Sequence, residues 1–283
     1  MIKEWLNEYK PGSNVEAEQA LREIIQEVAL FGLQQSGFFE VAAFYGGTAL
    51  RIFHGLPRFS EDLDFSLLQP MDDFSLQPYL AGTVEQLEAL GIHLEVREKA
   101  KAKPTGVDSA FLKAGTTWKE LVLKDVIPQE KLGMRPDIKI KLEVDTRPPD
   151  GFTTEQKLLL KPASFYVGVF TLPDLFAGKM HALLFRKWKG RVKGRDWFDL
   201  EWYVRKAIPL HLKHLEIRAR DSGDWSEQEM GAVDFLKILH EKIDQVSMDQ
   251  VRQDVMPFIP NVKVLDIWSP HYFHELAEKI RIV

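Results

Sequence analysis

The stretch YGGTALRIFHGLPRFSEDLDFSLL, residues 45–68, combines two adjacent glycines with two aspartates that are separated by one residue. A short apolar run precedes the glycines, and residues 48–54 have helical character until Gly55 and Pro57 end it. Residues 61–67 then alternate between polar and apolar side chains. The stretch therefore predicts a strand, a glycine turn, a short helix and a second strand.

The two aspartates, Asp62 and Asp64, belong to the polar face of the second predicted strand. A D-x-D pair on a strand directs both carboxylates to one side, where they can bind a hard cation such as Mg²⁺ and leave coordination positions for water and phosphate. Acids on an exposed strand face are also common as solvated groups, so this pair alone is not diagnostic. Its neighbours in the sequence carry the interpretation.

The glycines are the first of these neighbours. Gly46 and Gly47, followed by Thr48 at a helix start, can bring backbone N–H groups and a helix N-terminus close to a phosphate. The Walker pattern and the G-x-G-x-x-G fingerprint are both absent from this stretch. The glycines therefore indicate a phosphate contact of another type.

A third acid is expected from a separate strand. Residues 138–144 alternate strictly, and their polar face ends in Glu143 and Asp145. Both side chains point the same way from the strand, so sequence separates them poorly, and Glu143 is the first choice with Asp145 in reserve. Together with the D-x-D pair this acid could hold one or two Mg²⁺ ions.

Cationic side chains form the last part of the pattern. Lys179 and Arg186 are seven residues apart on a helix predicted from about residue 172 to 188, which places them two turns apart on one face. The segment 186–195, RKWKGRVKGR, holds six basic residues in ten. Further arginines that could neutralise a polyphosphate are Arg51, Arg58 and Arg195.

Composition limits the other functional classes. The 283 residues carry a net charge of −5 and no cysteine, which excludes disulfides, thiolate nucleophiles and cysteine-ligated zinc. No apolar run approaches the roughly 20 residues that span a bilayer, and the chain lacks an apolar signal core at its start, so a cytoplasmic location is expected.

The chain changes from mixed to helical character near residue 170, which predicts an α/β domain over 1–170 and a helical domain over 171–283. Serines in N-cap positions predict helix starts at Ser13, Ser226, Ser247 and Ser269.

Four motifs occur in order between about Phe44 and Tyr203, namely GGTALR with RFSEDLDF, IKIKLE, DLFAGKMHALLFR and KGRDWFDL. This set resembles the AbiEii/AbiGii toxin family within the polymerase β-like nucleotidyltransferase superfamily. The resemblance implies an α+β fold, with a nucleotidyltransferase-like mixed β-sheet flanked by helices and a mainly helical C-terminal domain that contributes Lys179 and Asp196 to the site.

The resemblance also implies roles for individual residues. The implied catalytic residues are Asp62, Asp64, Glu143, Lys179 and Asp196, and the first three of these would hold Mg²⁺. The implied substrate-binding residues are Gly46, Gly47, Thr48, Arg51, Arg58, Ser60, Arg186 and Arg195. Asp199 lies one helical turn after Asp196 and remains the alternative acid of the fourth motif.

The function that follows is transfer of a nucleoside monophosphate from a nucleoside triphosphate to a hydroxyl acceptor, with RNA, and a tRNA end in particular, as the expected acceptor. The resemblance further implies a toxin of a type IV toxin–antitoxin system with a cognate antitoxin. Two alternatives stay open, an antibiotic-modifying nucleotidyltransferase and a non-catalytic module that binds RNA or a partner protein. A phosphatase of the haloacid dehalogenase type is disfavoured, because RFSE rather than a buried apolar strand precedes the aspartates.

Overall fold

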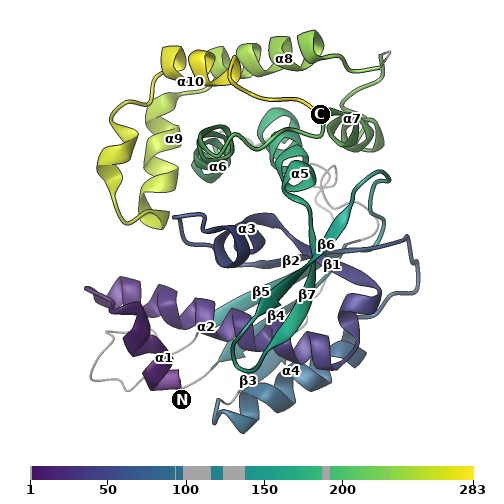
Figure 1. Cartoon of the computed structure of the whole chain (residues 1–283), viewed down its shortest axis with the longest axis vertical. Coiled ribbons are helices and arrows are strands. Elements are labelled where there is room, and N and C mark those ends of the chain that lie inside the picture. The colour runs from purple at the N-terminus through teal and green to yellow at the C-terminus, as the bar shows by residue number, and fades with distance from the viewer. Residues whose placement is uncertain (1, 93, 98–115, 124–137, 187–191, 228) are drawn as a thin grey trace. The chain divides into compact units, whose positions relative to one another are not determined.

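The computed structural model of the chain describes residues 2–92, 94–97, 116–123, 138–186, 192–227 and 229–283 (Figure 1). The chain divides into two compact units, which are treated separately below. Unit 1 consists of Met1–Phe53, Glu61–Pro148 and Glu155–Val169, and unit 2 of His54–Ser60, Pro149–Thr154 and Phe170–Val283. Two short segments that precede residue 170 are thus grouped with the later helices.

Unit 1 is built on one mixed β-sheet. Its strands are β1 (Ala42–Tyr45), β2 (Leu63–Leu67), β3 (Leu94–Arg97), β4 (Thr116–Leu123), β5 (Ile138–Asp145), β6 (Thr154–Leu159) and β7 (Phe165–Phe170), in the order β3-β4-β5-β2-β1-β7-β6. The pairs β2–β5 and β1–β7 are parallel, whereas β1–β2, β3–β4 and β4–β5 are antiparallel. The predicted class, a mixed sheet flanked by helices and followed by a helical region, is confirmed.

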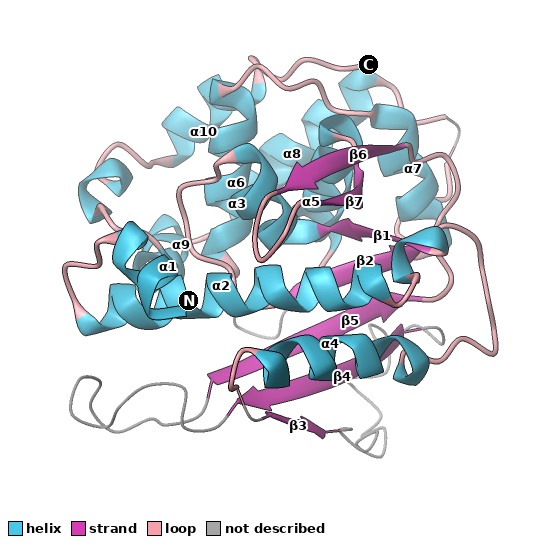
Figure 2. Cartoon of the chain, turned by 60° about the horizontal axis from the view of Figure 1, so that its bottom comes forward, coloured by secondary structure: helices cyan, strands magenta, loops and turns pink. Residues whose placement is uncertain are grey.

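The helices of unit 1 are α1 (Ile2–Tyr9), α2 (Asn14–Gln35), α3 (Gly46–His54) and α4 (Gln77–Ala89), with a 3-10 turn at Phe38–Glu40. Figure 2 shows α2 and α4 side by side over the strands. The two helices can approach closely because Gly32 has no side chain: a Cβ there would lie 2.4 Å from the Cα of Thr83. The predicted cap of α2 is confirmed, since Ser13 accepts a hydrogen bond from the N–H of Glu16.

The short strand β2 lies between β1 and β5 and carries one predicted acid. Leu63, Phe65 and Leu67 are fully buried in the core, as the alternation predicts, and Asp64 points to the opposite face. Asp62 directly precedes the strand. Ser66, which shares the face of Asp64, is only 3% exposed, so this face is covered beyond the aspartate.

Unit 2 contains six described helices, α5 (Leu172–Phe185), α6 (Gly194–Arg205), α7 (Leu212–Asp221), α8 (Ala232–Gln245), α9 (Met248–Val255) and α10 (Pro270–Ala277), with 3-10 turns at Met256–Phe258 and Val262–Leu265. Helix α6 packs tightly on α9, because a Cβ on Gly194 would lie 2.0 Å from the carbonyl oxygen of Val251. The backbone N–H of Gly194 donates to Asp254 at 2.8 Å. In the part of the chain that the structure describes, no helix is both long enough and apolar enough to cross a membrane.

The predicted starts of two C-terminal helices are confirmed, since Ser247 and Ser269 accept hydrogen bonds from the N–H groups of Gln250 and Tyr272. The start predicted at Ser226 is wrong. Helix α8 begins after Gly231, whose N–H donates to the Asp234 carboxylate at 2.9 Å. The apolar stripe of α8 begins only at this later position, with Phe235, and the buried apolar face decides where a helix runs.

Candidate active site

The glycine turn and the D-x-D segment meet at the start of α3. Gly46 has a φ of +84°, a conformation that a side chain disfavours. A Cβ at this position would lie 2.4 Å from Oδ2 of Asp64, so the glycine leaves the space that the carboxylate occupies. The glycine is therefore required twice, once for its backbone conformation and once for the approach of Asp64.

The first helical turn of α3 also fixes the other aspartate. The Thr48 side chain is fully buried, and its hydroxyl donates to the backbone carbonyl of Asp62 at 2.5 Å. This bond ties the residue before β2 to the helix that follows the glycines. Thr48, predicted to bind substrate, is here a residue that positions Asp62.

The third acid comes from β5, the parallel neighbour of β2. Asp64 lies opposite Glu143 in the register, whereas Asp145 lies opposite Ser66 and accepts a hydrogen bond from the backbone N–H of Arg147. The register therefore favours Glu143 over Asp145 as the partner of Asp64. The Glu143 carboxylate is 2.9 Å from the ammonium group of Lys141, and both side chains are about one-third exposed.

These acids match a hard divalent cation in kind, because all the donors are oxygens and the glycine gives the Asp64 carboxylate room beside the turn. As the side chains stand, the described ranges contain no group of three acids or histidines close enough to hold a metal ion. Glu143 faces Lys141 instead. A metal here would require Glu143 to leave this lysine.

Of the arginines predicted to bind substrate, Arg51 belongs to unit 1. Its Nε donates to Glu23 at 2.7 Å, and its side chain is 21% exposed. The ion pair joins α3 to α2. Contact between Arg51 and a nucleotide stays a prediction.

In unit 2 the predicted lysine and both candidate acids of the fourth motif form one buried network. The ammonium group of Lys179 lies 2.9 Å from Asp199 and 3.3 Å from Asp196. Asp199 is fully buried and receives two further bonds of 2.6 Å from Nε and Nη2 of Arg58. Helix α5 supplies the lysine and α6 supplies both acids, one turn apart.

Electrostatics keep this network charged. Burial alone would raise the pKa of Asp199, but the positive charges of Arg58 and Lys179 hold it below its ordinary value. Burial alone would lower the pKa of Arg58, and the adjacent Asp199 raises it instead. Arg58 is only 2% exposed and its third nitrogen donates to the carbonyl of Phe59. This arginine is therefore placed to hold Asp199, and its predicted contact with substrate stays untested.

The first turn of α5 is anchored by a buried acid. One oxygen of Asp174 accepts bonds from the N–H and hydroxyl of Thr153 and from the hydroxyl of Thr171, and the other bonds to Nδ1 of His211. Burial alone would raise the pKa of Asp174, but the hydrogen bonds from His211 and the threonines lower it. These contacts fix the helix that carries Lys179.

Sequence reasoning missed Tyr203, which lies one turn after Asp199 on α6. Its ring is fully buried and stacks on Phe176 at 4.2 Å. Its hydroxyl has no hydrogen-bond partner among the described residues. Burial and the charge of Asp199 raise the pKa of Tyr203 well above its ordinary value, so the phenol stays neutral. No sequence motif distinguishes this tyrosine from a core aromatic.

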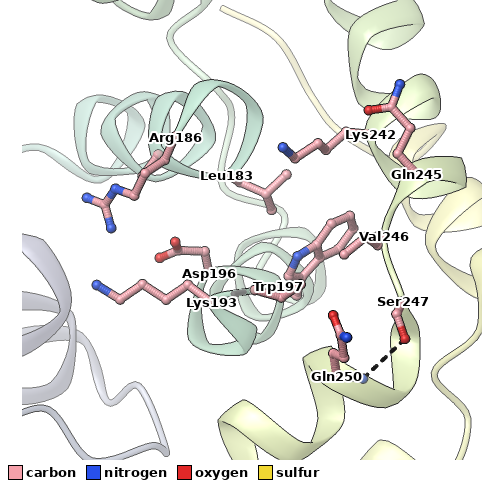
Figure 3. A pocket seen from close by; sticks show the side chains of 12 residues that line it. Leu183, Arg186, Lys193, Asp196, Trp197, Lys242, Gln245, Val246, Ser247 and Gln250 are labelled. Carbon is pink, nitrogen blue, oxygen red and sulfur yellow. Dashed lines mark hydrogen bonds between the residues drawn. The ribbon is translucent and has the colours of Figure 1, made fainter. Parts of the chain in front are cut away.

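A pocket of about 310 Å³ lies beside the network, between α5, α6 and the junction of α8 with α9 (Figure 3). Its charged lining groups are Arg186, Lys193, Asp196 and Lys242, and Trp197 forms part of its wall. Burial and the nearby cations lower the pKa of Lys193 to about 8, although the Asp196 carboxylate opposes this shift. Sequence reasoning included Lys193 only as part of the basic segment 186–195, which would suit an RNA end, and assigned no role to Lys242.

The remaining predicted site residues have these positions. Arg195 lies over the ring of Phe258 at 4.0 Å, so its charge rests partly on an aromatic face. Ser60 is partly buried in the segment His54–Ser60 of unit 2, and Gly47 is buried in the first turn of α3. Two tryptophans in or next to the basic segment, Trp188 and Trp197, are candidates for stacking on RNA bases, although core positions are favoured for both. Trp188 lies outside the described residues, and Trp197 is 2% exposed.

Within unit 1 the structure brings together Gly46, Asp64 and Glu143, with Asp62 adjacent. Within unit 2 it brings together Arg58, Lys179, Asp196 and Asp199. Each half of the predicted site is thus formed inside its own unit. The joining of the two halves around one substrate remains a prediction.

Solved structures define the class of this fold. A protein of H. pylori assigned as a nucleotidyltransferase aligns with 91% of this chain and 92% of its own length, at a TM-score of 0.51 and 17% identity. JHP933 from Helicobacter pylori aligns with 92% of this chain and 90% of its own length, at a TM-score of 0.51 and 16% identity. The similarity shows a shared nucleotidyltransferase-like fold.

The sequence identifies the family within this class. A family model described as nucleotidyl transferase AbiEii toxin, type IV TA system, matches residues 28–279, which is most of the chain. The chain belongs to this family of nucleotidyltransferase toxins, and the family resemblance inferred from the four motifs is confirmed. No curated protein matches the sequence.

Proposed function

We propose that this nucleotidyltransferase transfers a nucleoside monophosphate from a nucleoside triphosphate to a hydroxyl group of an RNA acceptor, with a tRNA end as the expected acceptor. The acceptor oxygen attacks the α-phosphorus in line, the bond to the β-phosphate breaks, pyrophosphate leaves, and a basic group of the site takes the hydroxyl proton. Family membership supports the transferase chemistry.

The observation that carries the proposal is the arrangement around Asp64. The carboxylate lies in the space left by Gly46 and opposite Glu143, where a bare turn, a helix start and two acids coincide. Backbone N–H groups at such a turn favour a phosphate, and the carboxylates beside it favour its counter-ion. The two features serve one ligand best, namely a metal-bound polyphosphate.

Mg²⁺ is the cation proposed for these acids. Asp62 and Asp64 would hold it, with Glu143 as the third ligand once it leaves Lys141. When bound, the cation neutralises phosphate charge and polarises the reacting phosphoryl group. Thr48 positions Asp62 through the hydrogen bond to its backbone carbonyl. Gly46 has no side chain and so leaves room for the Asp64 carboxylate beside the turn.

The unit 2 network would supply the cationic part of the site. Lys179 is proposed to contact phosphate, and its ammonium group is oriented by Asp199 and Asp196. Arg58 is proposed to act indirectly, because its guanidinium is buried against Asp199. The lysine is 18% exposed and so retains a surface on which a ligand oxygen could bind.

An RNA acceptor is favoured over a cationic antibiotic by the charged groups that line the pocket of unit 2. The pocket beside Asp196 has three basic side chains and one acid, and that acid is shared with Lys179. A pocket for an aminocyclitol drug would need the opposite balance. The family also leads us to expect a cognate antitoxin. We propose a cytoplasmic location, because nucleoside triphosphates and tRNA are found there.

Incubation of the purified chain with each labelled nucleoside triphosphate, Mg²⁺ and total RNA tests the proposal. We expect label in an RNA band of tRNA size, no transfer when a chelator replaces Mg²⁺, and at least 100-fold slower transfer by Asp64→Asn. Asp73→Asn is the matched control, because this acid is exposed and outside the proposed site.

Three outcomes would overturn the proposal. Transfer by a folded Asp64→Asn variant at the wild-type rate would remove the role given to this carboxylate. Label on an aminoglycoside and not on RNA would favour the antibiotic-modifying alternative, and RNA binding without transfer to any acceptor would favour a binding module.

A further inference from the structure

The pocket between α5, α6 and the α8–α9 junction has a lining that is not explained by the proposed chemistry. Figure 3 shows Arg186 and Lys193 on either side of the Asp196 carboxylate, with Lys242 reaching from α8 toward the same space over Leu183. Three cations and one acid thus line the pocket. That acid already bonds to Lys179 at 3.3 Å.

Lys242 is the informative member of this lining. Its side chain is half-buried, and its ammonium group forms no ion pair or hydrogen bond with any residue that the structure describes. Burial lowers its pKa, because a desolvated ammonium group without a partner is costly. An anionic ligand in the pocket would remove this cost.

Trp197 gives a second, independent indication. Its side chain is 2% exposed and packs edge-on against Phe273 at 5.0 Å. Its indole N–H forms no hydrogen bond with a residue that the structure describes, and it is not among the enclosed unpaired donors, so it remains accessible in the pocket that Trp197 lines. Figure 3 shows this nitrogen on the pocket side of the ring. The pocket therefore offers a neutral donor and an unpaired cation to a ligand with acceptor oxygens.

We propose that this pocket binds a backbone phosphate of the acceptor RNA strand, through Lys242, Lys193 and the indole N–H of Trp197. The proposal rests on the proposed function for the identity of the acceptor. At about 310 Å³ the pocket lies at the small end of ligand sites, so it accommodates a group of nucleotide size and not a duplex.

The lining also distinguishes a strand phosphate from a nucleoside triphosphate. A triphosphate is normally bound with a divalent cation, which needs carboxylate ligands. The only carboxylate among the described lining residues, Asp196, bonds to Lys179. A phosphodiester carries one negative charge and needs no metal. It therefore suits a pocket that offers hydrogen-bond donors and no carboxylate for a metal.

Fluorescence anisotropy with a labelled single-stranded RNA decamer, in the absence of Mg²⁺ and nucleotide, tests this binding directly. Lys242→Met removes the charge and keeps the apolar stem. We expect about tenfold weaker RNA binding at low salt, and a plot of log affinity against log salt whose slope is shallower by about 0.7. Lys237→Met on the same helix is the matched control, because Lys237 is exposed. The affinity of this variant for RNA should equal that of wild type.

The outcomes separate this proposal from the proposed function. If Lys242→Met has unchanged thermal stability and binds RNA as tightly as wild type, the pocket does not bind RNA. This conclusion holds even if wild type transfers nucleotide. Weaker binding of ATP with unchanged binding of RNA also overturns the proposal for this pocket, and assigns the pocket to the free nucleotide. A third outcome is a wild type that binds RNA but transfers no nucleotide, with weaker RNA binding in Lys242→Met. It would support the assignment of the pocket to RNA and count against the proposed transfer reaction. If Lys242→Met does not fold, Lys242→Gln provides the same comparison.

Discussion

The buried ion pair between Arg58 and Asp199 makes a quantitative prediction about stability. Both side chains are at most 2% exposed, and two bonds of 2.6 Å join them. Removing one partner of such a pair leaves an uncompensated buried charge, which costs about 3–5 kcal/mol. The cost should depend on which partners remain for the charge that is left behind.

Three single variants rank the contacts of this network. Asp199→Leu strands the Arg58 guanidinium and should cost about 4 kcal/mol. Arg58→Met leaves Asp199 with Lys179 at 2.9 Å and should cost about 3 kcal/mol. Lys179→Met leaves Asp199 with both arginine bonds and removes an ammonium group that is 18% exposed, so about 1 kcal/mol is expected.

The double variant Arg58→Met/Asp199→Leu separates charge burial from packing. Replacing both partners of a buried pair by apolar groups of similar volume is often neutral, so this variant should recover most of the stability that each single variant loses. Its transfer activity should stay low, because Lys179 has lost the carboxylate that orients it. Stability and activity would then be uncoupled.

Urea unfolding followed by tryptophan fluorescence measures these differences, since Trp197, Trp202 and Trp268 are buried in unit 2. Equal destabilisation by Arg58→Met and Lys179→Met would refute the reasoning, because it requires the arginine to be the main partner of Asp199. Failure of the double variant to recover stability would show that shape, and not charge, dominates at this position.

Three further predictions concern other parts of the chain. Gly46→Ala should cost at least about 1 kcal/mol and abolish transfer, because φ is +84° and the new methyl group would overlap the Asp64 carboxylate; thermal melting and the transfer assay check both effects. Burial, with the neighbouring Glu23, raises the pKa of Glu27 from 4.5 to about 7, so the folded state holds a proton that the unfolded chain has already released, and about 3 kcal/mol of stability is lost as the pH rises from about 4.5 through 7. Melting curves between pH 5 and 8 should show this decline in wild type and a flatter profile in Glu27→Gln. RNA affinity should fall as the pH rises through about 8, because Lys193 then loses its charge. The charged groups that face Lys193 are Asp196, Arg186, Lys179 and Arg195. The variant Lys193→Gln should bind RNA weakly and without this pH dependence.

The local elements around the site were readable from sequence because their signals are local. The glycine turn, the alternation of β2 and β5 and the serine caps of α2, α9 and α10 each depend on a few consecutive residues. The pairing of Asp64 with Glu143 is different, since the two residues are 79 positions apart in the sequence and alternation gives only the face of each strand. The ordered motifs of the family, and not the pattern of either strand, brought these acids together.

The sequence pattern did not predict strands β6 and β7, and a physical reason explains each omission. β6 (TEQKLL) is at the edge of the sheet and is partly exposed along its whole length, so its sequence lacks a buried face. β7 (FYVGVF) is a short, continuous apolar run, which periodicity cannot distinguish from a buried helical segment. β4 lies in a stretch from about residue 101 to 126 whose pattern gave no clear element.

Asp196 and Asp199 differ in their contacts within the folded chain and not in their sequence pattern. The two acids are one turn apart on α6 and both bond to Lys179, so neither spacing nor charge separates them. Their other contacts do. Asp199 also accepts two bonds of 2.6 Å from Arg58, which makes it the group that orients the lysine, whereas Asp196 lines the cationic pocket. If so, Asp196→Asn should change the apparent affinity for RNA at constant stability, while Asp199→Asn should lower stability and the rate of transfer together.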